Sequence, residues 1–344
     1  MSHTASPDHL LQTRGVSADT GAFVVAAAFD RAGRTAAFAL GDGTVRLLAG
    51  DTWSSVAAHD GAAQALAADT LPTGFVSGGD DGRFVRIGTD GGVAEIAGFG
   101  LKWVENVASF GDAKAPLLAC SVGKSIHIFD GAGTKLKTLT HPSSVTGLVF
   151  DAKGKRIAAS HYNGASLWFV ASKSENPRLL EWKGSHTGIV LSPDGDAVVT
   201  SMQENALHGW RLSDGQHMRM SGYPAKTQAM SFTKGGKWLA TSGAESIVLW
   251  PFTGGGPTGK TPTELAGGDT ALCSYVASHP QQEAVAGGFS DGLVVLADIP
   301  SQRILPVAGT GRGAVSAMAW SADGSKLAFG TETGFAAVVD FSRR

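Results

Sequence analysis

Histidines are the side chains of this sequence with the clearest capacity for chemistry, and five of the ten lie between residues 141 and 217. Neutral imidazole is a good ligand for zinc and other borderline metals. His141, His161 and His186, with Glu204 as a fourth donor, are therefore candidate ligands of one zinc ion. The competing interpretation is structural: His141 bonds within its own part of the fold, His186 is packed, and no cofactor is bound.

Aromatic and basic residues in and near the same stretch form a second candidate site. Its predicted members are Trp103, Tyr162, Trp182, Lys183 and Tyr223. Large aromatic and cationic groups dominate the hot spots of protein interfaces. These residues therefore predict a surface that binds a protein partner. For Trp103 the alternative is a covered side chain that fills a gap between structural units.

Recognisable catalytic motifs are missing from the sequence. It contains no G-x-S-x-G, no H-E-x-x-H and no paired cysteine pattern. Residues 254–261 read GGGPTGKT and match a phosphate-loop expression. That motif needs a helix directly after the loop, and the Thr-Pro-Thr at 261–263 does not begin one. The segment is predicted to be an enlarged loop, and the protein is predicted not to be an enzyme.

A pattern repeated eight times must position these residues. Each copy has an apolar stretch ending in a bulky residue, a polar turn, a second apolar stretch, a Gly/Asp/Asn-rich turn and a third apolar stretch. The first stretch ends at Phe29, Ala68, Phe110, Phe150, Leu191, Phe232, Val276 and Trp320, which lie 39 to 44 residues apart. A period of ~40–45 residues with several short strands in each copy is typical of a β-propeller.

Tight turns followed by apolar strands, such as GDGTVRLL at 41–48 and SDGLVVL at 290–296, predict hairpins. A more polar fourth strand, such as KLKTLT at 135–140, separates successive copies. We therefore expect an all-β propeller of eight four-stranded blades, which forms one domain over residues 1–344. The alternative is seven blades, with the second copy packed irregularly because residues 61–75 carry an insertion and small side chains.

The eighth copy reaches Arg344 without a fourth strand. Residues 9–13, HLLQT, are predicted to supply it by pairing beside residues 336–340. An N-terminal strand in the last blade would close the ring and remove an unpaired edge.

The rim of the propeller is where the candidate residues should meet. In this fold the loop leading into the innermost strand and the turn between the second and third strands open on the same rim. That arrangement places the candidate histidines, Glu204, Tyr162, Trp182, Lys183 and Tyr223 on one rim, over copies four and five.

Several segments resemble the WD-repeat family. LSPDG at 191–195 matches its turn after the innermost strand, and IFD at 128–130 stands where the family has Trp-Asp. The segments HYNGASLWF, LEWKGSH and LHGWRLSDGQHMRMSGYP are similar to bacterial single-domain members. The resemblance implies a binding platform, usually for other proteins. It also implies buried hydrogen-bonded sets of His, Ser, Asp and Trp, approached here by His141, Ser160, Asn163 and Trp168, and by His59, Ser77 and Asp80 or Asp81.

Composition limits the possible partners. The net charge is -2 and no basic stripe occurs, which argues against nucleic-acid and anionic-membrane binding. No run of ~18 apolar residues predicts a membrane span, and the N-terminus lacks a signal-peptide pattern. The two cysteines, Cys120 and Cys273, suit a reducing compartment. We expect a cytoplasmic, monomeric interaction scaffold; the alternatives are a metal-handling accessory protein and, third, a hydrolytic or other enzyme at the propeller mouth.

Overall fold

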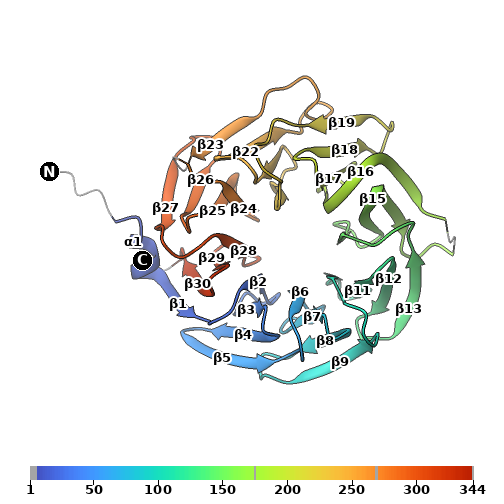
Figure 1. Ribbon diagram of the computed structural model, residues 1–344, viewed down its shortest axis with the longest axis horizontal. Coiled ribbons are helices and arrows are strands. Elements are labelled where there is room, and N and C mark those ends of the chain that lie inside the picture. The colour runs from blue at the N-terminus through green and yellow to red at the C-terminus, as the bar shows by residue number, and fades with distance from the viewer. Residues whose placement is uncertain (1–5, 174–175, 268–269, 343–344) are drawn as a thin grey trace.

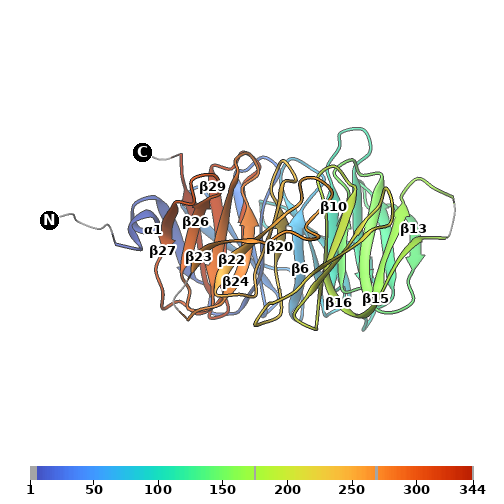
Figure 2. The same ribbon diagram turned by 90° about the horizontal axis from the view of Figure 1, so that it is seen from above.

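A closed ring of antiparallel β-sheets, arranged about one axis, makes up the protein (Figure 1). The computed structural model describes residues 6–173, 176–267 and 270–342. Viewed from the side, the ring is a disc whose strands run between its two rims (Figure 2). The all-β propeller prediction is confirmed. No helix in the described part of the chain is long and apolar enough to cross a membrane.

The first three copies of the sequence repeat each form a four-stranded sheet, with the first strand innermost. Repeat 1 contains β2 (Val24–Phe29), β3 (Thr35–Leu40), β4 (Thr44–Ala49) and β5 (Thr52–Ala57). Repeat 2 contains β6 (Ala63–Ala68), β7 (Phe75–Gly79), β8 (Arg83–Ile87) and β9 (Val93–Gly98). Repeat 3 contains β10 (Asn106–Phe110), β11 (Leu117–Val122), β12 (Ser125–Asp130) and β13 (Lys135–Thr140). The second repeat is therefore regular, contrary to the expectation for residues 61–75.

Repeats 4 and 5 share one six-stranded sheet. Its strands are β14 (Gly147–Phe150), β15 (Arg156–Phe169), β16 (Arg178–Leu191), β17 (Ala197–Met202), β18 (Leu207–Arg211) and β19 (His217–Met220). Residues 178–185 of β16 pair with β15, whereas residues 186–191 pair with β17. One strand thus ends repeat 4 and begins repeat 5.

The last three repeats return to four-stranded sheets. Repeat 6 contains β20 (Met230–Phe232), β21 (Trp238–Thr241), β22 (Ser246–Pro251) and β23 (Thr263–Gly267). Repeat 7 contains β24 (Cys273–Ser278), β25 (Ala284–Phe289), β26 (Val294–Asp298) and β27 (Ile304–Ala308). Repeat 8 contains β28 (Val315–Trp320), β29 (Lys326–Thr331), β30 (Phe335–Asp340) and, from the other end of the chain, β1 (Gly15–Asp19).

Counted as hydrogen-bonded sheets, the described ring has seven members rather than the eight separate blades that were expected. The alternative count of seven holds, but for a different reason from the one given. The sequence pattern repeats eight times, and the continuous strand β16 merges the sheets of two copies into one. Two separate sheets would need a turn between the last strand of repeat 4 and the first strand of repeat 5. The segment LEWKGSH at 180–186 continues as strand instead.

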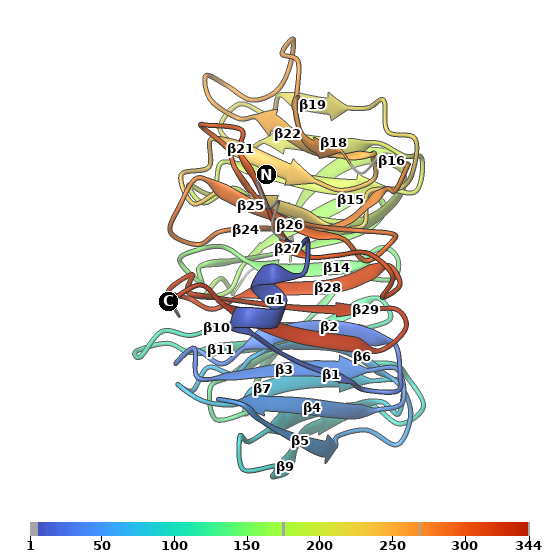
Figure 3. The ribbon, with the colours of Figure 1, turned by 90° about the vertical axis from the view of Figure 1, so that its left-hand side faces the viewer.

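The N-terminus closes the ring, but through a different segment from the predicted one. β1 pairs antiparallel with β30, from Gly15 opposite Val339 to Asp19 opposite Phe335. Residues 9–13 lie instead in the helix α1 (His9–Arg14), which rests on the outer side of the ring beside β27 (Figure 3). Leu10 and Leu11 are both buried, and adjacent residues of a strand would point to opposite faces. A helical turn lets both side chains reach the core.

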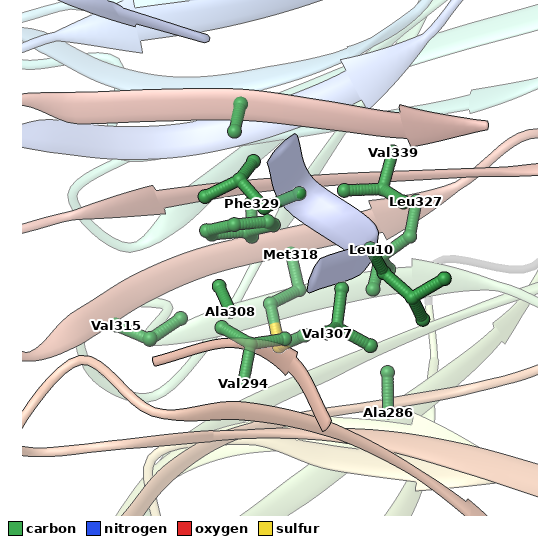
Figure 4. Close-up of a cluster of buried hydrophobic side chains, with 12 residues drawn as sticks. Leu10, Ala286, Val294, Val307, Ala308, Val315, Met318, Leu327, Phe329 and Val339 are labelled. Carbon is green, nitrogen blue, oxygen red and sulfur yellow. The ribbon is translucent and has the colours of Figure 1, made fainter. Parts of the chain in front are cut away.

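The core lies between the faces of neighbouring sheets. Leu10 packs with Val307 of β27 and with Phe329 and Val339 of repeat 8 (Figure 4). Strands β3, β11, β17 and β25 are buried along their whole length. Each sheet packs against two neighbours, so these strands lack the alternation of a half-exposed strand and consist mainly of apolar and small residues.

Candidate functional site

A cavity of about 370 Å³ opens between repeats 4 and 5, and we call it the rim pocket. It is lined by Tyr162, Trp182, Lys183, Gly184, Met202, Glu204, Ala206 and Arg219. Three of the five predicted partner-binding residues and the predicted metal donor Glu204 therefore lie around one cavity. These four residues come from β15, β16 and the turn after β17.

A bulge in β15 positions the outer wall of the rim pocket. The pairing of β15 with β16 shifts register between Tyr162 and Gly164. Asn163 has a φ of 66°, and its Oδ1 accepts a hydrogen bond from the Gly184 amide at 3.2 Å. A Cβ on Gly164 would lie 2.1 Å from the Leu180 carbonyl oxygen, so only glycine fits the bulge. The bulge leaves Tyr162 59% exposed.

Trp182 is held in place from two sides. Its indole stacks on the His208 ring, with centroids 3.9 Å apart and planes 13° from parallel. Its backbone carbonyl oxygen lies 2.9 Å from His186 Nε2, which donates to it. His208 Nε2 in turn lies 2.9 Å from His217 Nδ1, within hydrogen-bonding distance. Trp182 is thus a half-buried, fixed aromatic surface rather than a free side chain.

The charged residues of the rim pocket are Lys183, Glu204 and Arg219. Glu204 Oε1 lies 3.5 Å from the backbone amide of Ser185, which is a weak contact. A Cβ on Gly184, whose φ is 121°, would lie 2.8 Å from Met202 Cε and 3.0 Å from Glu204 Oε1. Glycine at position 184 therefore keeps this side of the cavity open.

Two predicted partner-binding residues lie outside the rim pocket. Trp103 is 55% exposed in the loop between β9 and β10, so the covered alternative is wrong, but it does not line the cavity. Tyr223 is buried, and its prediction as a contact residue is wrong. Its hydroxyl accepts a hydrogen bond from Trp250 Nε1 at 2.6 Å and lies 2.6 Å from Thr241 Oγ1.

Sequence spacing contained a signal for the role of Tyr223. Tyr223, Thr241 and Trp250 are separated by 18 and 9 residues, close to the 19 and 8 that separate His141, Ser160 and Trp168. Tyr223 therefore takes the place of the histidine in the buried polar set of repeat 6. The family resemblance had implied a histidine, rather than a tyrosine, at that place.

The predicted zinc donors do not converge on one point. His161 contacts the Tyr162 carbonyl oxygen at 2.9 Å and Ser166 Oγ at 2.8 Å, and His186 Nδ1 lies 2.7 Å from Thr200 Oγ1. Among the residues that the structure describes, no group of three or more His, Cys, Asp or Glu side chains could hold a metal ion. Backbone carbonyl and hydroxyl oxygens occupy both ring nitrogens of His161 and of His186, so these imidazoles are not free to bind a metal ion.

His141 illustrates the structural alternative for these histidines. It is buried, and its Nε2 accepts a hydrogen bond from Trp168 Nε1 at 3.1 Å. Burial, with a smaller contribution from His161, lowers the pKa of His141 to about 4. Burial and then the neighbouring His217 lower the pKa of His208 to about 3. Both rings are therefore neutral at neutral pH.

Repeat 2 contains the more complete polar set of the kind that the family resemblance implied. His59 Nε2 lies 2.9 Å from Ser77 Oγ, and His59 Nδ1 lies 3.1 Å from Asp81 Oδ1. Ser77 Oγ donates to the Ala65 carbonyl oxygen, which ties the set to the innermost strand. Asp81, rather than Asp80, is the carboxylate that contacts the histidine.

The glycine-rich segment 254–261 lies in the loop between β22 and β23, as predicted, and no helix follows it. Lys260 Nζ donates to the Thr253 carbonyl oxygen of the same loop. The adjacent cavity is lined on its other side by Asp194 and Asp196, which would repel a phosphate. This arrangement is that of an enlarged loop.

Comparisons with known proteins support the family resemblance at a distance. No family model matches the chain. The WD repeat-containing protein slp1 of Schizosaccharomyces pombe is 29% identical over 120 residues, which cover 33% of this chain and 24% of that protein. The match thus spans about a quarter of the relative's length.

A crystal structure of the computationally designed Ika8 protein superposes with a TM-score of 0.73 and 18% identity, covering 93% of this chain and 96% of that one. At this identity the likeness concerns the fold alone. Together, the ring and the distant match support a WD-repeat-like β-propeller.

Proposed function

We propose that this protein is a non-enzymatic interaction scaffold of the WD-repeat type that binds a protein partner through the rim pocket. The observation that carries the proposal is the placement of Tyr162, 59% exposed, beside the fixed indole of Trp182 in a cavity of about 370 Å³. Aromatic side chains held in a concave site bury a large area at little cost in conformational entropy, as in interface hot spots.

The position of the rim pocket in the fold supports the same function. Binding residues concentrate on loops that a rigid framework positions. The bulge in β15 and the hydrogen bonds of His186 fix the walls of the pocket before any partner arrives. A preformed site loses less freedom on binding, which favours affinity.

The cysteines and the net charge bear on the location and the partner of the protein. The described cysteines, Cys120 and Cys273, are free and buried, as suits a reducing compartment. We therefore propose that the protein acts in the cytoplasm as a monomer. The acidic net charge of -2 favours a protein partner over nucleic acid.

Affinity capture of partners from the native cell, followed by quantitative mass spectrometry, tests the proposal. Tyr162→Ala removes an exposed ring and should weaken capture of the main partner about tenfold or more, the effect of removing a hot-spot residue. The matched control is Trp103→Ala, an exposed aromatic on the same rim outside the pocket. Equal capture by wild type and a folded Tyr162→Ala variant, with loss in Trp103→Ala, would move the site to repeat 3.

A further inference from the structure

The two cations of the rim pocket, Lys183 and Arg219, form no ion pair with a carboxylate, in contrast to five other arginines of the chain. Arg83, Arg86, Arg156, Arg211 and Arg312 each form an ion pair with an aspartate or glutamate. None of the ion pairs among the described residues involves Lys183 or Arg219. Two cations therefore line one cavity without a direct contact to a carboxylate.

The local charge of the rim pocket is opposite in sign to that of the whole chain. Two cations and one carboxylate, Glu204, line the cavity, while the chain carries a net charge of -2. Burial lowers the pKa of His186 and of His208, which lie behind the pocket wall, so these two rings add no charge at neutral pH. A concave site with a net positive charge attracts anionic ligand groups and strengthens their binding when water is displaced.

The aromatic residues of the rim pocket favour a ligand that carries an apolar group beside its anionic group. Tyr162 and Trp182 provide apolar surface next to Lys183, which directly follows Trp182 in β16. Arg219 lies opposite His208 in the pairing of β18 with β19, on the strand bordering the stacked indole. A guanidinium binds a carboxylate through two parallel hydrogen bonds, and the neighbouring rings suit an apolar side chain.

We infer that the rim pocket binds an acidic segment of a protein partner, with Lys183 and Arg219 contacting its Asp or Glu carboxylates and Tyr162 and Trp182 contacting an adjacent apolar side chain. This inference deepens the proposed function and rests on it. The scaffold selects partners by charge as well as by shape, and binding weakens as added salt screens the exposed charges.

Fluorescence anisotropy with labelled peptides tests the inference on the full-length protein. The probe is Gly-Glu-Phe-Glu-Phe-Glu-Gly, and the matched peptides carry Gln or Lys in place of each Glu. The Glu peptide should bind at least about tenfold more tightly than the Gln peptide, as expected for close charge pairs at an interface. Equal affinities, or preference for a phosphotyrosine peptide with no binding of the Glu peptide, would overturn the inference.

Charge reversal makes the test specific to the site. The double variant Lys183→Glu and Arg219→Glu should no longer bind the Glu peptide and should bind the Lys peptide instead. The control is Lys102→Glu combined with Lys124→Glu, the same charge change at two exposed rim positions outside the pocket. An equal switch in the control would show non-specific attraction and overturn the inference. If charge reversal unfolds the protein, the milder double variant Lys183→Gln and Arg219→Gln should still bind the Glu peptide at least about tenfold more weakly than the wild type.

Native partner capture separates the inference from the proposed function. If Tyr162→Ala abolishes capture while the charge-reversed protein captures normally, the rim pocket binds a partner but not through acidic residues. If neither variant affects capture, the proposed function fails as well.

Discussion

The ring has two opposite sides that are held together in different ways (Figure 1). On one side, repeat 8 closes by non-covalent contacts only: β1 pairs with β30, and Leu10 and Leu11 pack against the seam. On the other side, repeats 4 and 5 are joined by continuous strand, because the 14-residue strand β16 pairs with both β15 and β17. We call these the seam side and the pocket side.

The two sides also differ in how many of their buried polar atoms lack a hydrogen-bond partner. The seam side contains an almost wholly apolar cluster. On the pocket side, His141 Nδ1, His208 Nδ1 and Trp210 Nε1 are buried without a hydrogen-bond partner in the described structure. Each such group costs free energy of about 1–3 kcal/mol. These unpartnered groups lie on the same side of the ring as the rim pocket and its exposed Tyr162.

Removing residues 1–19 should have the largest effect on this comparison, because the deletion takes away both α1 and β1. Burial of Leu10 and Leu11 alone contributes about 3–6 kcal/mol, at about 1.5–3 kcal/mol for each side chain. We expect the free energy of unfolding to fall by at least about 4 kcal/mol in urea titrations followed by tryptophan fluorescence.

A shorter deletion, of residues 1–14, keeps β1 and removes only the helix. It should give an intermediate loss. A full deletion with an unchanged unfolding midpoint would mean that the seam side does not depend on the N-terminal segment, and the contrast between the two sides would disappear.

Acidification should act on the pocket side through His141. Its pKa is about 4 in the fold and 6.5 in its ordinary state, so the neutral ring is favoured by folding. This contribution is present in full above pH 6.5 and is lost as the pH falls from 6.5 towards 4. The two pKa values correspond to about 3 kcal/mol at about 1.36 kcal/mol per pH unit.

His141→Gln keeps an acceptor for Trp168 Nε1 but does not titrate. The comparison is the free energy of unfolding at neutral and acidic pH in wild type and variant, because all other titrating groups are common to both. The variant should show a smaller loss on acidification. Identical pH dependences would mean that His141 does not contribute to the acid sensitivity of the protein.

Prediction from the sequence succeeded where a regular pattern carried the information. The repeat identified the propeller, and the rim mapping brought Tyr162, Trp182, Lys183 and Glu204 together. Prediction failed where local backbone geometry and hydrogen bonds decide which way a side chain points. Whether a rim aromatic points outward, as Tyr162 does, or inward, as Tyr223 does, depends on a bulge and on a hydroxyl partner that strand periodicity does not encode.

Two further errors have the same origin. Leu10 and Leu11 fit a strand as an apolar pair, but only the packing against β27 and β30 selects a helix. The predicted zinc donors shared a rim, but side-chain direction depends on hydrogen bonds to Thr200 and Ser166. The number of sheets likewise depended on whether residues 182–185 turn or continue as strand.

The smallest expected effect concerns the ion pair of the seam side. Arg312 Nη1 and Nη2 donate to the Asp8 carboxylate at 3.0 and 2.9 Å, and the Gly309 amide donates to it at 2.6 Å. The hydrogen bond from Arg312 lowers the pKa of Asp8, so its contribution is present above the usual pKa of 3.8 and is lost as the pH falls below it. Because the pair is partly exposed, we expect Asp8→Asn to cost less than about 1 kcal/mol.

A double-mutant cycle of Asp8→Asn and Arg312→Gln measures the pair itself, since Arg312 also lies 5.0 Å over the ring of Phe335. The coupling free energy should be about 0.5–1 kcal/mol and should shrink with added salt. A coupling near the loss caused by the full deletion would mean that charge, rather than strand pairing and apolar packing, closes the ring. The seam side would then resemble the pocket side in depending on polar contacts.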